Sequence, residues 1–264
     1  MAKTSWLKKL AKDTISRSAG IVAEHAAQGA TTDSVLVKDQ LPQLDQAACP
    51  NHSPSAVEIV NLDAFSLARR VLAGEPRACW AEETGPWLQV YTKTQEEALC
   101  YSSTLYVTLK PEYYPWPNYG PGCVAGIYSP GVVIFRDDLD HRCEELSLED
   151  RRVVSVLTVA APAWADLTED ETTFADPQVL GWLREKIRLV YRMAAHNGQD
   201  HLVLGAMGCG AYECPPELVA REMRDILREA EFEGWFKKVV FAVYSTAENG
   251  EGNFGIFRDV FGQV

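Results

Sequence analysis

Short runs of β-favouring residues alternate with helical stretches along the chain between positions 56 and 244. This alternation predicts an α/β fold in which helices cover both faces of a mixed, mostly parallel sheet. The run at 153–159 is almost continuously apolar, which is typical of a central strand buried on both faces. The predicted strands are 56–60, 132–135, 153–160, 201–204 and 239–244, the predicted helices are 65–72, 94–106, 177–196 and 216–231, and a loop is predicted at 111–130.

A helical extension and a linker at 1–54 are expected to precede one domain at 55–264. Apolar residues recur at helical spacing near the start of the chain with lysines between them, which predicts an amphipathic helix. The segment 29–54 is polar and contains three prolines, so we expect it to be mostly irregular. For the first helix we favour packing on its own domain over a membrane-surface or organelle-targeting role.

The sequence carries a net charge of −12, and this charge is unevenly distributed. The first 20 residues hold five basic residues and one acidic residue, so the rest of the chain carries −16. Such an acidic body repels nucleic acids and anionic membranes at long range. We therefore expect neither as a partner, and a phosphate-bearing ligand would need local backbone donors instead of a basic surface.

The seven cysteines are odd in number and scattered without a Cys-x-x-Cys pair, so they do not predict a disulfide framework. Reduced thiols are typical of cytoplasmic or nuclear proteins.

No apolar run approaches the length of a membrane span, and the first residues lack a secretory signal pattern. His196 and His201 flank an Asn-Gly turn signal and do not share a helix face, so no metal site is predicted. We expect a monomer that needs no cofactor.

A glycine-rich segment follows the predicted strand at 201–204 and reads Gly-Ala-Met-Gly-Cys-Gly-Ala-Tyr from Gly205 to Tyr212. Two prolines and Glu217 then mark the start of a helix. Such a loop lies at the carboxyl end of a strand and beside a helix N-terminus, so its backbone N–H groups favour a diphosphate. The alternative is a tight turn that needs glycine for steric reasons alone. The glycine spacing matches neither the dinucleotide-binding fingerprint nor a Walker A loop.

Two adjacent glutamates, Glu96 and Glu97, open the predicted helix at 94–106. They would supply an acid and a ligand-orienting group to a site beside the helix start. The alternative is structural, because Thr94 and Glu97 have the spacing of a capping box. On spacing alone the cap explains both residues.

Three segments follow one another in a combination that is far more specific than any one of them. They are Gln-Glu-Glu at 95–97, Tyr-Ser-Pro with Phe-Arg-Asp-Asp between 128 and 138, and Gly-Ala-Met-Gly-Cys-Gly from Gly205. Together they resemble the microbial-type poly(ADP-ribose) glycohydrolase family, over residues 55–250. The resemblance implies a macrodomain-like fold, with a mixed sheet between helices, that binds ADP-ribose or an ADP-ribosylated protein.

The resemblance also implies roles for individual residues along a bound ADP-ribose. Glu97 would be the general acid/base at the distal ribose, while Glu96 and Gln95 would orient that ribose or the catalytic residue. Cleavage of the ribose bond passes through an oxocarbenium-like state, in which a carboxylic acid protonates the departing oxygen and its conjugate base activates water. The other implied contacts are Gly205, Gly208, Cys209, Gly210 and Ala211 at the diphosphate, Asn61 and Asp63 near the adenosine, and Tyr212, Phe254 or Phe257 beside a sugar or base.

The segment before Gln95 departs from the family pattern. Where the family has a Gly-Gly-Gly run, this chain reads Thr84-Gly85-Pro86, so Gly85 is the ligand-contacting glycine that is kept. Pro86 has no backbone N–H and restricts Gly85 to extended geometry, so one expected donor is missing.

The resemblance and this departure from it lead to two hypotheses for the function. The first is a hydrolase that cleaves ADP-ribosyl linkages, and the second is a non-catalytic ADP-ribose reader or scaffold. A sugar- or nucleotide-handling protein unrelated to ADP-ribose is the third hypothesis.

Overall fold

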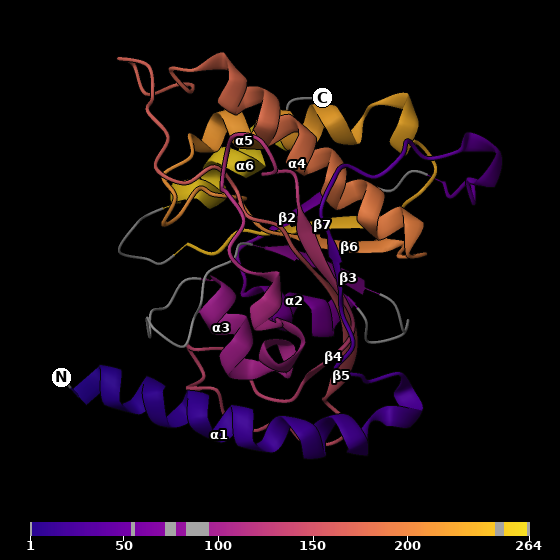
Figure 1. Cartoon of the computed structure of the whole chain (residues 1–264), viewed down its shortest axis with the longest axis vertical. Coiled ribbons are helices and arrows are strands. Elements are labelled where there is room, and N and C mark those ends of the chain that lie inside the picture. Colours follow the sequence, from indigo (N-terminus) through magenta and orange to yellow (C-terminus); the bar gives the residue numbers. More distant parts are fainter. Residues whose placement is uncertain (1, 54–55, 72–77, 83–94, 246–250, 263–264) are drawn as a thin grey trace.

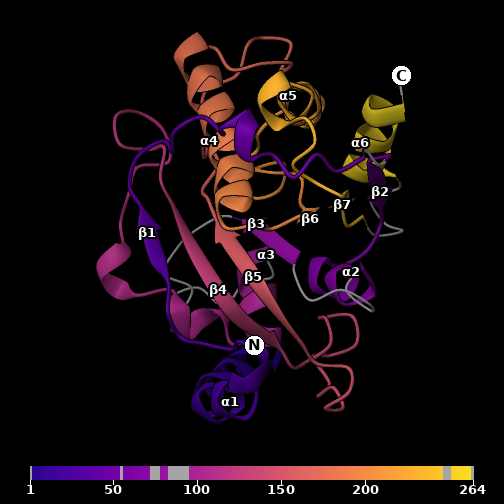
Figure 2. The ribbon, with the colours of Figure 1, turned by 90° about the vertical axis from the view of Figure 1, so that its right-hand side faces the viewer.

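The computed structural model describes residues 2–53, 56–71, 78–82, 95–245 and 251–262. Its strands are β1 (Val35–Val37), β2 (Glu58–Val60), β3 (Ala78–Glu82), β4 (Gly126–Ile134), β5 (Arg152–Thr158), β6 (His201–Leu204) and β7 (Lys238–Ala242). In this part of the chain the seven strands form one sheet in the order β1-β4-β5-β3-β6-β7-β2, with β1 and β2 at its edges (Figure 2). Strands β5, β3, β6, β7 and β2 are parallel, whereas β4 is antiparallel to both β5 and β1.

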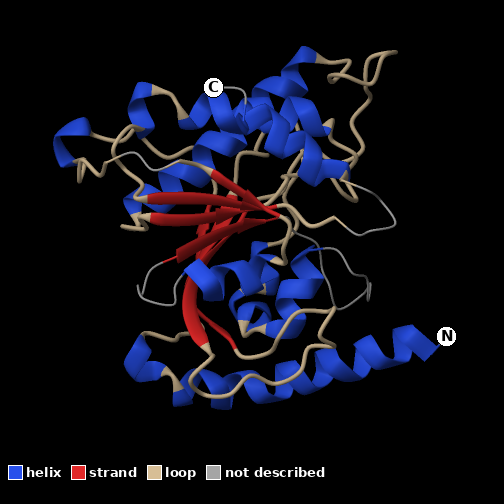
Figure 3. Cartoon of the chain, turned by 180° about the vertical axis from the view of Figure 1, so that it is seen from behind, coloured by secondary structure: helices blue, strands red, loops and turns tan. Residues whose placement is uncertain are grey.

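Helices cover both faces of this sheet, as Figures 1 and 3 show from opposite sides. They are α1 (Ala2–Glu24), α2 (Ala64–Val71), α3 (Gln95–Ser102), α4 (Pro177–His196), α5 (Pro216–Leu227) and α6 (Gly252–Gly262). Helices α4, α5 and α6 pack on one face, and α1, α2 and α3 pack on the other. Leu202 and Leu204 of β6 face the first group, while Val203 between them faces the second. The predicted α/β fold with a mixed, mostly parallel sheet is confirmed.

Helix α1 packs along α3 and β4 through the apolar side that the sequence pattern identified. Leu7, Leu10 and Ala11 are buried there. The buried hydroxyl of Thr14 donates a hydrogen bond of 3.0 Å to the Tyr101 carbonyl of α3. Arg17 adds an ion pair of 2.6 Å to Glu145 at the surface. None of the described helices is long and apolar enough to cross a membrane.

Strand β1 lies inside the segment 29–54, which the sequence predicts to be mostly irregular. It pairs with β4, whose register with β5 shifts between Ser129 and Val132. At this irregularity a Cβ atom on Gly131 would lie 2.4 Å from the Gly29 carbonyl oxygen. Only glycine therefore allows the N-terminal segment to approach β4 so closely. The division of the chain at residue 54 stays a prediction.

The sequence patterns do not predict β1, β3 or α6, and they misplace the boundaries of several other elements, such as α5, which ends at Leu227 and not at 231. Strand β4 begins at Gly126, inside the predicted loop at 111–130, because pairing with β1 and β5 compensates for its Ser, Pro and Gly residues. Helix α3 ends at Ser102 and not at 106. The hydroxyls of Ser102 and Ser103 bond to carbonyls of the last turn, and Ser103 then bridges to Ile134 of β4.

A buried lysine connects α4 to the segment that follows β5. The Lys186 side chain is fully buried, and its Nζ donates hydrogen bonds of 2.6 Å to the Cys123 carbonyl and 2.7 Å to the Ala160 carbonyl. Burial of an ammonium group is tolerated when its protons are satisfied in this way. Lys186 thus positions the chain at Ala160, next to the loop that follows β6.

Candidate active site

Helix α3 presents its two glutamates in its first turn, where the helix dipole favours negative charge. Glu96 is buried, and Glu97 is half-buried with its Oε2 atom shielded from solvent. The rest of the helix is anchored in the core, since Leu99, Cys100 and Tyr101 are almost fully buried. The start of α3 is therefore held rigidly. Thr94, the other half of the expected capping box, lies outside the described residues.

The loop at 205–214 follows β6 and reaches the start of α3. A Cβ atom added to Gly205 would lie 2.9 Å from Oε1 and 3.1 Å from Nε2 of Gln95. The backbone at Gly205 thus touches the Gln95 side chain, and a larger residue would push it away. The two segments that the sequence analysis singled out, far apart in the chain, meet at this contact.

Two further glycines of the loop have different surroundings. Gly208 has a φ of +72°, and a Cβ there would lie 2.5 Å from Cys214 Sγ and 2.7 Å from Ala161 Cβ. Gly208 therefore fits the steric explanation for glycine, a turn packed tightly against its neighbours. Nothing lies within 4 Å of the corresponding position at Gly210, and no positive φ requires glycine there. Packing within the chain does not explain Gly210.

Several backbone N–H groups of the loop have no backbone acceptor in the part of the chain that the structure describes. Among the described residues, the N–H groups of Gly208, Gly210 and Ala211 donate to no backbone carbonyl. Successive N–H groups of this kind, at the end of a strand, form anion-binding sites. Other parts of the loop are fixed, because the Cys214 N–H bonds to the Gly208 carbonyl at 2.9 Å and Asn253 Nδ2 bonds to the Cys209 carbonyl at 3.0 Å.

The aromatic residues proposed to flank a sugar or base differ in accessibility. Tyr212 is half-buried, and its ring meets the exposed Trp164 ring edge-on at 5.5 Å. Phe254 is also half-buried and carries Arg258 over its ring at 5.7 Å. Phe257 is fully buried against Phe241, so it belongs to the core and the proposal that it contacts a ligand is wrong.

A cavity of about 350 Å³ opens between α2, α3 and the end of β7. Gln95 and Ala98 line it from α3, and Asp63 lines it from the turn before α2. On the opposite side the Tyr244 hydroxyl donates a hydrogen bond of 2.6 Å to Asp140, and both residues line the cavity. This volume lies within the usual range of small-molecule sites, about 300–1,000 Å³. Because Gln95 also touches Gly205, the cavity and the glycine loop are neighbours.

Asp63 has a structural role besides lining the cavity. Its Oδ1 accepts a hydrogen bond of 3.0 Å from the Ser66 N–H in the first turn of α2, as a helix N-cap does. Burial raises the pKa of Asp63 from 3.8 to about 6, and the Ser66 hydrogen bond only partly opposes this rise. The carboxyl group is thus poised to exchange a proton near neutral pH.

Asn61 joins the ends of two strands. Its Nδ2 donates to the Ser245 carbonyl at 3.0 Å, and its Oδ1 accepts from the Ser245 N–H at 2.8 Å. This pair of bonds closes the turn after β2 onto the segment after β7. The proposed adenosine contacts of Asn61 and Asp63 stay predictions, and Gly85 lies outside the described residues.

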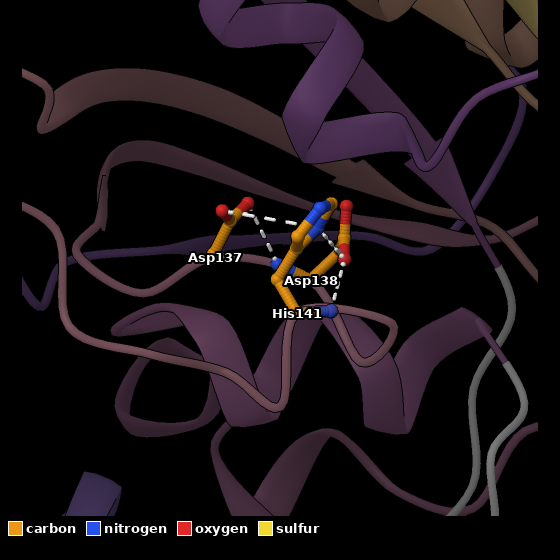
Figure 4. Close-up of side chains that lie close together, drawn as sticks. All are labelled: Asp137, Asp138 and His141. Carbon is orange, nitrogen blue, oxygen red and sulfur yellow. Dashed lines mark hydrogen bonds and ion pairs between the residues drawn. The ribbon is translucent and has the colours of Figure 1, made fainter.

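One cluster in the described part of the chain has the side chains of a metal site. Ligand atoms of Asp137, Asp138 and His141 lie within 4.8 Å of one another (Figure 4). Each carboxylate already has a partner, because Asp137 pairs with Arg69 at 2.5 Å and Asp138 bonds to His141 at 2.7 Å. The hydrogen bond to Asp138 raises the pKa of His141, which favours the protonated ring over a metal-binding one.

The described fold and this strand-end loop define a macrodomain-like protein. A family model described as the microbial-type PARG catalytic domain matches residues 24–137. The solved poly(ADP-ribose) glycohydrolase of Thermomonospora curvata has a TM-score of 0.77 to this chain at 28% identity, over 96% of this chain and 98% of that one. A point mutant of the Deinococcus radiodurans enzyme, solved with ADP-ribose, has a TM-score of 0.65 at 33% identity, over 80% and 85%.

The chain belongs to the microbial-type poly(ADP-ribose) glycohydrolase family. The Thermomonospora curvata enzyme was also solved with the inhibitor ADP-HPD, and that structure has a TM-score of 0.74 to this chain at 28% identity, covering 96% of this chain and 98% of that one. The search of curated protein sequences found no match. The resemblance noted from the three sequence segments is therefore confirmed at the level of the family and the fold.

Gly208→Ala is expected to lower the free energy of unfolding by about 2 kcal/mol or more, because the new Cβ combines a positive φ with overlap on Cys214 and Ala161. Denaturation in urea measures the change. Gly210→Ala is the matched control in the same loop, and its stability should stay within about 0.5 kcal/mol of the parent. Equal losses for the two variants would contradict this account of the loop.

Asp63→Asn should flatten the pH dependence of stability between pH 4 and 7. The folded-state pKa of Asp63 lies above the unfolded value of 3.8, so the folded protein binds the extra proton and loses stability as the pH rises through about 6. Asn keeps the N-cap but carries no titrating group. The unfolding free energy of the variant relative to the parent should rise by about 1–3 kcal/mol from pH 4 to pH 7. Asp39→Asn, at an exposed position, is the control, and a difference independent of pH would refute the assignment.

Proposed function

We propose that this protein binds ADP-ribose and hydrolyses the ribose glycosidic bond of ADP-ribosyl groups, with Glu97 as general acid/base. The observation that carries the proposal is the contact between Gly205 and Gln95. It brings a loop with available N–H groups next to a helix start that carries two carboxylates. A diphosphate and the sugar beyond it need these two kinds of group side by side.

Each part of ADP-ribose has a matching surface in this arrangement. The adenosine enters the cavity beside Asp63 and Tyr244. The diphosphate accepts hydrogen bonds from the N–H groups around Gly208, Gly210 and Ala211. The distal ribose then lies at the first turn of α3. Backbone donors suit this acidic chain, because they need no basic side chains.

Glu97 performs two proton transfers in the proposed reaction. Its carboxylic acid first protonates the oxygen that leaves the distal ribose, while positive charge develops on the sugar ring. The resulting carboxylate then takes a proton from the water that attacks the ring carbon, which restores the acid. Gln95 and Glu96 orient the ribose and Glu97. The rigid anchoring of α3 supports this role, since acid/base catalysis depends on position.

A second candidate function is a non-catalytic reader or scaffold for ADP-ribose. The observation that favours it is Thr84-Gly85-Pro86 in place of the Gly-Gly-Gly run of the family. Pro86 removes one backbone donor, and Thr84 and Pro86 add side chains. A reader would bind ADP-ribose but release none from a modified protein, so measuring binding and turnover on one preparation separates the two functions.

The proposal also includes the substrate, the oligomeric state, the cellular compartment and the domain division. The substrate is a polymer of ADP-ribose or an ADP-ribosylated protein, and the protein acts as a monomer. Six cysteines within the described residues are free thiols, which suits the cytoplasm or the nucleus. A helical extension at 1–54 and an ADP-ribose-binding domain at 55–264 complete the proposal.

Glu97→Gln should abolish hydrolysis while leaving the unfolding free energy within about 1 kcal/mol of the parent, because glutamine has nearly the same shape but cannot transfer the proton. The assay measures ADP-ribose released from an ADP-ribosylated protein. Glu112→Gln, at an exposed glutamate, is the control and should keep full activity. Release by the Glu97 variant at the parent's rate would exclude Glu97 as the catalyst.

Gly210→Ala should weaken ADP-ribose binding about tenfold with little loss of stability, because the new methyl group blocks the approach of the diphosphate to the loop. Isothermal titration calorimetry measures the affinity. Gly181→Ala on α4 is the matched control, since it also has nothing within 4 Å of the added Cβ. If the parent shows no heat with millimolar ADP-ribose, both the hydrolase and the reader are excluded.

A further inference from the structure

A second groove, of about 400 Å³, adjoins the cavity at the candidate active site. Leu62 and Asp138 line both hollows, so the groove continues from the end of the cavity that holds Asp63. One side of the groove is α2, with Arg69 and Arg70. The other side is the chain between His141 and Arg152. No step of the proposed reaction uses this groove.

Each carboxylate of the groove already has a hydrogen-bond or ion-pair partner within the chain. Asp137 pairs with Arg69 at 2.5 Å. Asp138 accepts hydrogen bonds from the Ser66 hydroxyl at 2.8 Å and from His141 at 2.7 Å. Burial alone would raise the pKa of Asp138, but these hydrogen bonds outweigh it and lower the pKa. Asp150 accepts a hydrogen bond of 2.7 Å from Ser147.

Two arginines of the groove have no carboxylate partner among the described residues. Arg70 is exposed on α2. Arg152 donates to the carbonyls of Glu149 at 2.6 Å and Arg151 at 2.7 Å, which leaves its charge unpaired. The buried Nε of Arg69 has no hydrogen-bond partner there either. The groove is lined by three arginines and three aspartates, and two of its guanidinium groups are not paired with a carboxylate in the described part of the chain. Guanidinium groups bind phosphate well.

We propose that this groove binds a phosphate group attached beyond the adenosine of a ligand that occupies the neighbouring cavity. The inference rests on the proposed function, which seats adenosine in that cavity. The same chemistry has two sources: a phosphate ester on the adenosine ribose, and the diphosphate of the next unit in an ADP-ribose chain. In either case Arg70 and Arg152 receive the phosphate, and the ligand gains affinity over plain ADP-ribose.

Calorimetry with three ligands tests the inference. They are ADP-ribose, ADP-ribose 2′-phosphate and the dimer of ADP-ribose, with the dimer measured on Glu97→Gln to prevent its cleavage. At low salt, ADP-ribose 2′-phosphate, the dimer or both should bind about tenfold more tightly than ADP-ribose does to the same protein. The ligand that gains affinity identifies the source of the phosphate.

Arginine variants then assign the gain to the groove. Arg70→Gln and Arg152→Gln should each reduce the gain to about threefold or less and leave the affinity for ADP-ribose unchanged. Arg228→Gln is the matched control, because Arg228 is an exposed arginine in a different cavity, beside Leu227 and Phe232. It should keep the full gain.

The outcomes separate this inference from the proposed function. If ADP-ribose binds but neither ADP-ribose 2′-phosphate nor the dimer binds more tightly, the groove inference is overturned and the proposed function stands. The groove inference is also overturned if one of these ligands does bind more tightly but keeps its full gain in affinity in both Arg70→Gln and Arg152→Gln. If ADP-ribose itself fails to bind, both proposals fall.

Discussion

The close approach of backbone to side chain at two glycines is the constraint on which the candidate site depends. At Gly205 the backbone lies against Gln95, and at Gly208 it lies against Cys214 and Ala161. A Cβ atom at either position would force its neighbours apart, so the loop after β6 can adopt this path only without side chains there. The path brings the loop to the start of α3. Because β6 and α3 are each anchored in the core, the contact joins two rigid elements.

The Phe-Arg-Asp-Asp segment also connects elements that are far apart in the chain. The Arg136 guanidinium pairs with Asp13 of α1 and also donates to the Cys143 carbonyl at 3.3 Å. The next two residues turn toward α2, where Asp137 meets Arg69 and Asp138 meets Ser66. One short segment thus fixes α1 and α2 relative to β4. Asp138 of this segment also lines both the cavity and the arginine-lined groove, so the segment shapes the proposed site without taking part in the reaction.

Much of the architecture could be predicted from the sequence, and the failures have identifiable causes. Helix α4 and strand β6 begin and end where the patterns predict, because a proline start and a continuous apolar run mark them. The sequence pattern does not reveal strand β1, because three residues on an edge carry too weak a pattern and only pairing with β4 makes them a strand. The sequence does not show that Phe257 belongs to the core, because an aromatic residue that contacts a ligand and one that fills a core look alike in a sequence.

The sequence by itself determined the fold class, the family and the candidate site residues, because local periodicity and motif order can be read directly from the order of residues. Three facts were decided only by the tertiary structure. Gly205 touches Gln95, Gly208 is required by packing whereas Gly210 is not, and the arginines of α2 line a groove next to the cavity. The contacts of Gly205 with Gln95 and of Gly208 with Ala161 join residues far apart in the chain. Their existence depends on how strands and helices pack, which no local pattern encodes.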